Sequence, residues 1–324
     1  MTRLLAAVLV VGAMVPSYAS VPEYPCYRPS VAPVIDGDVA GDPAWKNIPA
    51  VTGFSILGDG YTMAKQSTAQ CCWDDEAFYV AVTCEEPDAP NLHITVVDGG
   101  NFWEDDGLEI FVRPGADAQV FQFGVTAGGA KGAYLGFADF TKLQAAAKMG
   151  KGFYSIELRL AYALLRATPK VGDVWFGDFC RNIFTTNSGG DRFTCWAPLK
   201  TQFNEPANFG AFHLLGPAPD PAEADRISAG LNAPYRDKLA GMIAVAAAKG
   251  SEYTAVLDEA ARDPKFRTSA NDLRLRWDRV TRAGRGTSSA SVWDLRRAIT
   301  DVDALVRESY DLKYAYLIEK LFPE

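Results

Sequence analysis

The sequence predicts a mainly β protein: an antiparallel, jelly-roll-like β-sandwich followed by an α-helical bundle. From Pro33 to about Leu215 apolar and polar residues alternate, which is typical of half-buried strands. Beyond Gly216 the apolar residues recur at helical spacing instead. The charge changes at the same point: residues 1–215 hold 15 basic and 23 acidic residues, and residues 216–324 hold 17 of each, so the net charge of -8 lies in the first part. Two composition regimes in one chain predict two domains.

The first residues have the pattern of an export signal. Arg3 is followed by an apolar run over residues 4–15, and small residues up to Ala19 suit a signal peptidase. The run is too short for a membrane span, which needs about 20 apolar residues. We therefore expect a signal peptide over residues 1–19 and a mature protein that is secreted or periplasmic.

Five segments of the first part have the composition and alternation of strands, and turn residues such as Pro114-Gly115 separate them. Many short strands separated by turns are typical of a sandwich or a barrel. The predicted sandwich covers residues 20–215. Its clearest strands are 77–84, 107–112, 119–126, 153–160 and 174–181.

The second part, residues 216–324, is predicted to be helical. A proline-rich stretch over residues 216–221 leads into it as a stiff linker. Gly250 and Asp263-Pro264 are expected helix ends. From Val292 to Leu321 the apolar residues keep one helical period, which predicts a single long helix. Helices of this kind pack antiparallel as a small bundle.

The six cysteines all lie in the first part of the chain. An even number in an oxidising compartment predicts up to three disulfides, and free buried thiols are the alternative. The chain has no C-x-x-C pair, which excludes thioredoxin-like and zinc-ribbon interpretations. Cys180 and Cys195 are the preferred disulfide, because both are expected on strands that flank one loop.

Several functions are disfavoured by the sequence. The acidic net charge argues against a nucleic-acid partner held by phosphate contacts. No serine nucleophile elbow, H-E-x-x-H helix or P-loop is present. A glycosidase needs two carboxylates at a set separation, and the sequence places no such pair. We therefore expect no enzymatic activity.

Six motifs follow one another along the first part of the chain, and in this order they resemble carbohydrate-binding module family 9 and its family-9-like relatives. The resemblance covers residues from about 30 to 215 and does not include the helical part. The motifs are Pro33-Val-Ile-Asp-Gly-Asp38 with Pro43-Ala-Trp45, then Cys72–Val82, Phe102–Phe111, Tyr154–Leu160, Gly172–Arg181 and Asn204–Gly210.

The resemblance implies a β-sandwich that binds glycans, including chain ends, without cleaving them, often beside a polysaccharide-degrading enzyme. Trp103 lies six residues before Glu109, as the family's stacking ring lies before its acidic ligand. Gln122 stands in the strand that normally offers an arginine. The second stacking ring is expected near residues 196–204, where Trp196 and Phe203 are both candidates. A pyranose packs its C–H face on an indole and offers hydroxyls to carboxylates and amides.

A structural calcium ion is common in the family that the chain resembles. Asp36, Asp38 and Asp42 lie in a glycine-containing loop and carry the hard oxygen ligands that Ca²⁺ prefers. Their spacing is not that of an EF-hand. We expect this loop to be either a calcium site or a solvated turn.

Two alternatives to sugar binding remain open. The first is a haem-binding, electron-transfer sandwich of the DOMON kind, with His93 or His213 and Met63 or Met149 as axial ligands. The second is a sandwich that has lost sugar binding and serves as a scaffold. In either case residues 216–324 are expected to mediate self-association or docking onto a partner enzyme.

Overall fold

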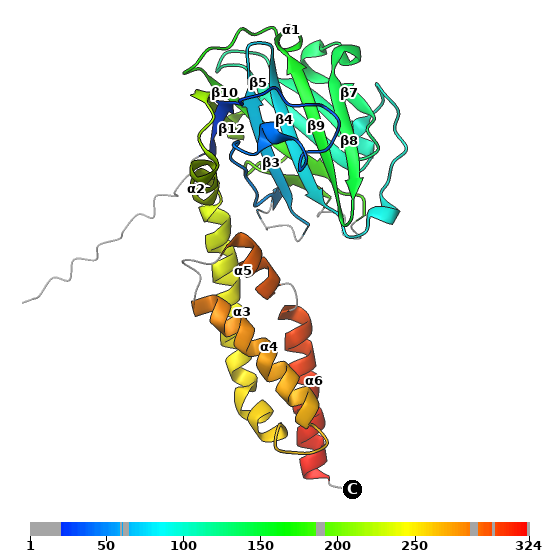
Figure 1. Cartoon of the computed structure of the whole chain (residues 1–324). Helices are drawn as coiled ribbons and strands as arrows, with labels where there is room; N and C mark the ends of the chain where they lie inside the picture. Colours follow the sequence, from blue (N-terminus) through cyan, green and yellow to red (C-terminus); the bar gives the residue numbers. More distant parts are fainter. Residues whose placement is uncertain are drawn as a thin grey trace, which may run out of the picture.

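The computed structural model describes residues 21–58, 60, 65–185, 192–285, 291–299 and 302–322. The predicted signal peptide lies outside the described residues, as does Met63. Figure 1 shows a β-rich body with a long helical body extending from one end of it. The predicted fold class, a sandwich followed by a helical bundle, is confirmed.

The β-rich body is one large mixed sheet that folds over into two layers. Its strand order is β7-β6-β5-β10-β12-β1-β3-β4-β9-β8, with β11 pairing β10 and β2. The pairings are antiparallel except at β1, which is parallel to both β12 and β3 and so joins the two layers. The strands are β1 Glu23–Arg28, β2 Ser55–Ile56, β3 Ser67–Trp73, β4 Ala77–Glu85, β5 Gly107–Arg113, β6 Phe121–Thr126, β7 Lys131–Ala133, β8 Gln144–Gly150, β9 Phe153–Ala161, β10 Val174–Asn182, β11 Phe193–Cys195 and β12 Gly210–Pro217.

The alternation of side chains along β5 divides the sheet into two faces. Leu108 and Ile110 point into the main core between the layers, where they join Phe123 and Phe179. Glu109, between them, lies on the opposite face. Because a strand has a period of two, one residue of register decides which side chains reach that outer face.

Among the described residues, five helices form the second body. They are α2 Pro221–Leu231, α3 Ala233–Ala260, α4 Arg267–Arg285, α5 Val292–Ile299 and α6 Val302–Leu321; a short helix α1, Tyr162–Leu165, belongs to the sandwich. Asp220 caps α2 by accepting a hydrogen bond from Glu223 N at 2.9 Å. The bundle core is built from buried residues such as Ile243, Leu257 and Trp277.

The single helix predicted from Val292 to Leu321 is wrong, because the structure has two helices there. α5 ends at Ile299 and α6 begins at Val302. Thr300 and Asp301, which stand between them in the sequence, both have low helix propensity. The division lets α5 and α6 each contribute to the bundle core, through Leu295 and Leu305.

The bundle is fixed to the sandwich by specific polar contacts. The Asn232 side chain accepts a hydrogen bond from Thr52 N at 2.8 Å and donates one to Ala50 O at 3.0 Å. It thus pairs with the backbone of the sandwich in the way that the backbone of a neighbouring strand does. Arg296 of α5 forms an ion pair with Glu85 at the end of β4. None of the described helices is long and apolar enough to cross a membrane.

Candidate functional site

Three polar side chains converge on the outer face of the sheet formed by β5, β6 and β10. Gln122 Nε2 donates to Glu109 Oε2 at 2.6 Å, and Asn182 Nδ2 donates to Glu109 Oε1 at 2.8 Å. All three residues are buried. Asn182 Oδ1 has no hydrogen-bond partner among the described residues. Asn182 is fully buried, so the atoms of this group that a ligand with hydroxyl groups can reach belong to Glu109 and Gln122, which are 5% and 7% exposed.

An aromatic pair borders this polar group on the β6 side. Trp103 lies in a 3₁₀ turn, Phe102–Glu104, and contacts Tyr134 edge to face with 5.2 Å between ring centroids. The Tyr134 N–H donates to Gln122 O at 3.0 Å, so the pair stands beside Gln122. Trp103 is partly exposed and Tyr134 is 60% exposed, so both rings are accessible to a ligand.

The position of Trp103 depends on the absence of a side chain at Gly124. The Phe102 ring packs directly on this glycine: a Cβ at Gly124 would lie 1.8 Å from Phe102 Cδ2. Gly124 is paired with Glu109 across β5 and β6. Because Gly124 has no side chain, the 3₁₀ turn can lie on the sheet next to Glu109. This places Trp103 over the edge of the sheet.

A second aromatic pair lies on the β10–β11 side. Phe193 is paired in register with Asn182 and contacts Phe203 edge to face at 5.8 Å. Phe203 is buried in a cluster on the outer face with Phe111 and Phe209, whereas Phe193 is partly exposed. The polar group thus lies between two aromatic walls, Trp103–Tyr134 and Phe193–Phe203.

Burial raises the pKa of Glu109, and the hydrogen bonds from Asn182 and Gln122 oppose this by favouring the ionised form. The neighbouring acids have other roles. Asp105 accepts from Thr95 N and Val96 N, and Asp106 accepts from His93 N and Phe184 N. These two carboxylates hold loops in place around the site.

Sequence reasoning missed three residues of this face: Asn182, Tyr134 and Phe193. Asn182 is the last residue of β10, one position beyond the predicted strand. Asn182 lies two and four residues after Cys180 and Asp178, so the period of a strand places all three side chains on one face. Cys180 is paired with Glu109, so this is also the face of Glu109. Tyr134 follows a glycine-rich turn, and no local pattern marks it or Phe193 as neighbours of the site.

Trp196, predicted as a candidate for the second ring, is not brought to the face of Glu109. Its indole stacks on Phe212, with 6.0 Å between centroids and 8° between planes, and contacts Tyr24 and Phe179 of the main core. Its outer edge lines a different cavity, between the sandwich and α3. Of the two candidates, only Phe203 lies on the predicted side of the sheet.

The predicted disulfide between Cys180 and Cys195 is not present in the structure. The two residues do lie opposite each other in register on β10 and β11, as the sequence indicated. Both are nevertheless free, buried thiols, as are the other four cysteines. The Cys195 thiol donates instead to Ser55 O at 3.7 Å, on the far side from β10.

The three aspartates predicted to bind calcium do not converge. Asp42 accepts hydrogen bonds from Val34 N and Ala44 N, Asp38 pairs with Lys148 at 2.7 Å, and Asp36 accepts from Asp38 N. Their carboxylates are used one by one to shape the loop. Within the described ranges, no group of three His, Cys, Asp or Glu residues could hold a metal ion.

The histidines of the haem alternative each face a carboxylate. His93 Nε2 lies 3.8 Å from Asp105 Oδ1, and the His93 ring packs against Phe184. His213 Nε2, on β12, lies 3.5 Å from Glu23 Oε2. Met149 is an exposed residue of β8. Nothing in this arrangement favours axial haem ligation.

Comparison with known proteins gives matches for the sandwich. The family of carbohydrate family 9 binding domain-like proteins matches residues 35–217. A family 9 carbohydrate-binding module from Caldicellulosiruptor kristjanssonii, solved with cellotriose, is 22% identical and aligns over 59% of this chain and 93% of its own, with a TM-score of 0.44. A family 9 module from the same organism, solved with glucose, is also 22% identical. It aligns over 59% of this chain and 95% of its own, with a TM-score of 0.43. None of the curated proteins compared with the chain matches it.

Proposed function

Because the chain belongs to the carbohydrate family 9 binding domain-like family, we propose that the face around Glu109 binds a neutral oligosaccharide and does not cleave it. The observation that carries the proposal is the convergence of Glu109, Gln122 and Asn182 between two aromatic pairs. Aromatic walls with hydrogen-bonding groups between them are the chemistry that a pyranose requires.

Each group has a distinct role in this proposal. The Trp103 ring packs on the C–H face of a sugar, and Phe193 with Phe203 bounds the opposite side. Glu109 accepts a hydrogen bond from a sugar hydroxyl, and the buried Asn182 holds the Glu109 carboxylate through its 2.8 Å hydrogen bond. Gln122 holds the Glu109 carboxylate in position through its 2.6 Å hydrogen bond.

The arrangement of acids supports binding without catalysis. Glycoside hydrolysis requires two carboxyl groups on either side of the scissile bond. Glu109 bonds with the side-chain amides of the face, whereas the nearby buried acids Asp105, Asp106 and Asp178 accept hydrogen bonds from backbone N–H groups. Burial also raises the pKa of Asp178 well above its usual value, which favours a neutral, structural carboxyl.

The proposed setting is outside the cytoplasm, in the breakdown of a polysaccharide. The apolar run and small residues at the start of the sequence support export. The excess of acidic over basic residues in residues 1–215 favours neutral glycans over anionic ones, because like charges repel.

Calorimetric titration with cello-, xylo- and manno-oligosaccharides tests the proposal, with Trp103→Ala as the variant and Trp293→Ala as the matched control. Trp293 is an exposed tryptophan of α5, outside the sandwich that carries the site. An aromatic anchor contributes about 2 kcal/mol, so Trp103→Ala should weaken binding roughly thirtyfold, while Trp293→Ala should leave it unchanged. A folded protein that binds none of these sugars would refute the proposal.

A further inference from the structure

An open apolar groove runs along the bundle between α3 and the α5–α6 pair. Its volume is about 860 Å³. On the α3 side it is lined by Met242 and Val245, which are 48% and 62% exposed. On the α6 side it is lined by Val306 and Tyr310, and Tyr310 is 52% exposed. Exposed apolar side chains gathered on two adjacent helices are typical of an interaction surface.

The groove exists because α3 and α6 carry apolar residues on two faces. Ile243 and Leu305 point into the bundle core, while Val245 and Tyr310 lie outside it on the same two helices. On α6 the exposed row continues one turn at a time through Tyr314 and Ile318. A helix that is apolar on more than one side is usually covered on more than one side.

Charged residues frame the groove in a self-complementary order. On α3, Lys249 lines the groove and is followed three residues later by the exposed Glu252. On α6, Arg307 lines the groove and is followed four residues later by the exposed Asp311. None of these four residues forms an ion pair with another residue that the structure describes. Elsewhere on the bundle, Lys265 pairs with Glu319, Arg276 with Glu308, and Lys320 with Glu259.

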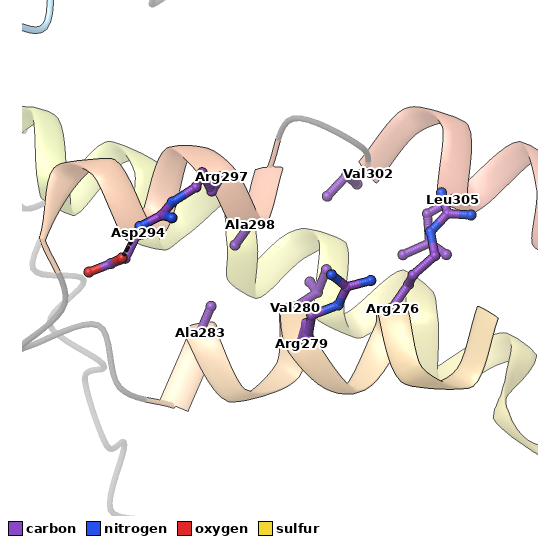
Figure 2. A pocket seen from close by; sticks show the side chains of 9 residues that line it. All are labelled: Arg276, Arg279, Val280, Ala283, Asp294, Arg297, Ala298, Val302 and Leu305. Carbon is purple, nitrogen blue, oxygen red and sulfur yellow. Dashed lines mark hydrogen bonds and ion pairs between the residues drawn. The ribbon is translucent and has the colours of Figure 1, made fainter. Parts of the chain in front are cut away.

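A second depression on the bundle, between α4, α5 and α6, has a different balance of charge. Figure 2 shows that its lining combines the arginines Arg276, Arg279 and Arg297 with apolar residues such as Val280 and Leu305. Arg276 pairs with Glu308, and Arg297 pairs with Asp294 at 2.8 Å. Arg279 forms no ion pair with another described residue, so this lining carries three arginines against the one acidic residue Asp294, whereas basic and acidic residues are balanced around the larger groove.

We propose that the α3–α6 groove is a two-fold interface between two copies of this chain, with their bundles antiparallel. A two-fold axis across the helices reverses the order of residues on the facing surface, so a basic residue of one copy meets the acidic residue one turn away on the other. Val245 and Tyr310 of each copy then fill the groove of its partner. The bundle has no net charge over residues 216–324, so long-range repulsion does not oppose the pairing.

The oligomeric state of the full chain, measured by light scattering during gel filtration, tests this inference. The key variant is Val245→Glu, and its matched control is Leu275→Glu. Leu275 is 61% exposed on α4, against 62% for Val245, and does not line the groove. We expect the wild type and Leu275→Glu to be dimers and Val245→Glu to be a monomer with unchanged helical circular dichroism.

A charge exchange tests the antiparallel order separately. Lys249→Glu should weaken the dimer, because it places like charges opposite each other, and adding Glu252→Lys to the same chain should restore it. A monomeric wild type would overturn the proposal and leave the groove to a different partner. A dimer that survives Val245→Glu, or is lost equally in Leu275→Glu, would also overturn it. Because none of these measurements involves sugar, they are independent of the proposed binding function.

Discussion

At the scale of single residues, Glu109 illustrates a conflict between binding and stability. Glu109 is 5% exposed, and burial raises the pKa of its carboxyl despite two amide hydrogen bonds. A buried carboxyl with a raised pKa folds more favourably when protonated, so its contribution to stability is present below its unfolded pKa and is lost as the pH rises through the folded value. The ionised form, however, is the better acceptor for a sugar hydroxyl.

We therefore predict opposite effects of Glu109→Gln on stability and on sugar binding at neutral pH. The free energy of unfolding should stay the same or increase, because the variant resembles the protonated form. The dissociation constant for oligosaccharide should rise by roughly tenfold to a hundredfold. This corresponds to the loss of one hydrogen bond to a charged group, which contributes about 1.5–3 kcal/mol. Denaturant unfolding and calorimetry measure the two effects.

The pH profile supplies the control for this prediction. Binding to the wild type should weaken as the pH falls through the raised pKa of Glu109, while binding to Glu109→Gln should be flat over the same range. A wild-type profile that is equally flat would show that the ionisation of Glu109 plays no part in binding.

At the scale of elements, close packing at one glycine joins α3 and α4 of the bundle. Trp277 of α4 lies on Gly250 of α3, where a Cβ would stand 2.3 Å from Trp277 Cε3. The same indole donates from Nε1 to Ser309 Oγ of α6 at 2.9 Å, and Ser309 is fully buried. One tryptophan thus links α3, α4 and α6. Gly250 was expected to end a helix, but it lies inside α3 because this contact outweighs its low propensity.

Gly250→Ala should lower the free energy of unfolding by about 1–3 kcal/mol, because the added methyl forces Trp277 out of its position. Gly230→Ala in α2 is the matched control, since a Cβ there meets nothing within 4 Å. The control should raise stability by roughly 0.5–1 kcal/mol through helix propensity. Thermal or denaturant unfolding followed at the helical signal distinguishes the two, and equal effects would contradict the packing argument.

At the scale of the whole molecule, charge and shape are divided between the two bodies. The acidic sandwich stands at one end of a neutral helical body, whose C-terminus lies at the other end in Figure 1. An antiparallel dimer would therefore place its two sandwiches at opposite ends, where their charges repel least. It would also present two sugar-binding faces on one particle.

Such a dimer predicts a difference between long and short ligands. Val245→Glu should weaken binding to a polysaccharide by roughly a hundredfold, because a second attachment on the same particle is lost. Its affinity for a short oligosaccharide that occupies one site should equal that of the wild type. Calorimetry with the short ligand and retention on immobilised polysaccharide make the comparison. Equal retention of the two proteins would argue against bivalent binding.

The sequence alone determined much of the fold and part of the candidate site. The period-two pattern located β4, β5, β6, β9 and β10, because successive side chains of a strand point to opposite faces of the sheet. The resemblance singled out Glu109 and Gln122, which the structure joins by a hydrogen bond. The proline-rich stretch and the change of period indicated where helices follow strands.

Only the tertiary structure decided which distant residues share a face. Asn182 reaches Glu109 and Phe193 stands beside it through the pairing of β10 with β5 and β11, which no local pattern specifies. Trp196 turns into the core, and Asp36, Asp38 and Asp42 each bind a different partner, because strand register and loop path place them there. Local sequence sets the period of an element, whereas contacts between elements far apart in the chain set what that element faces.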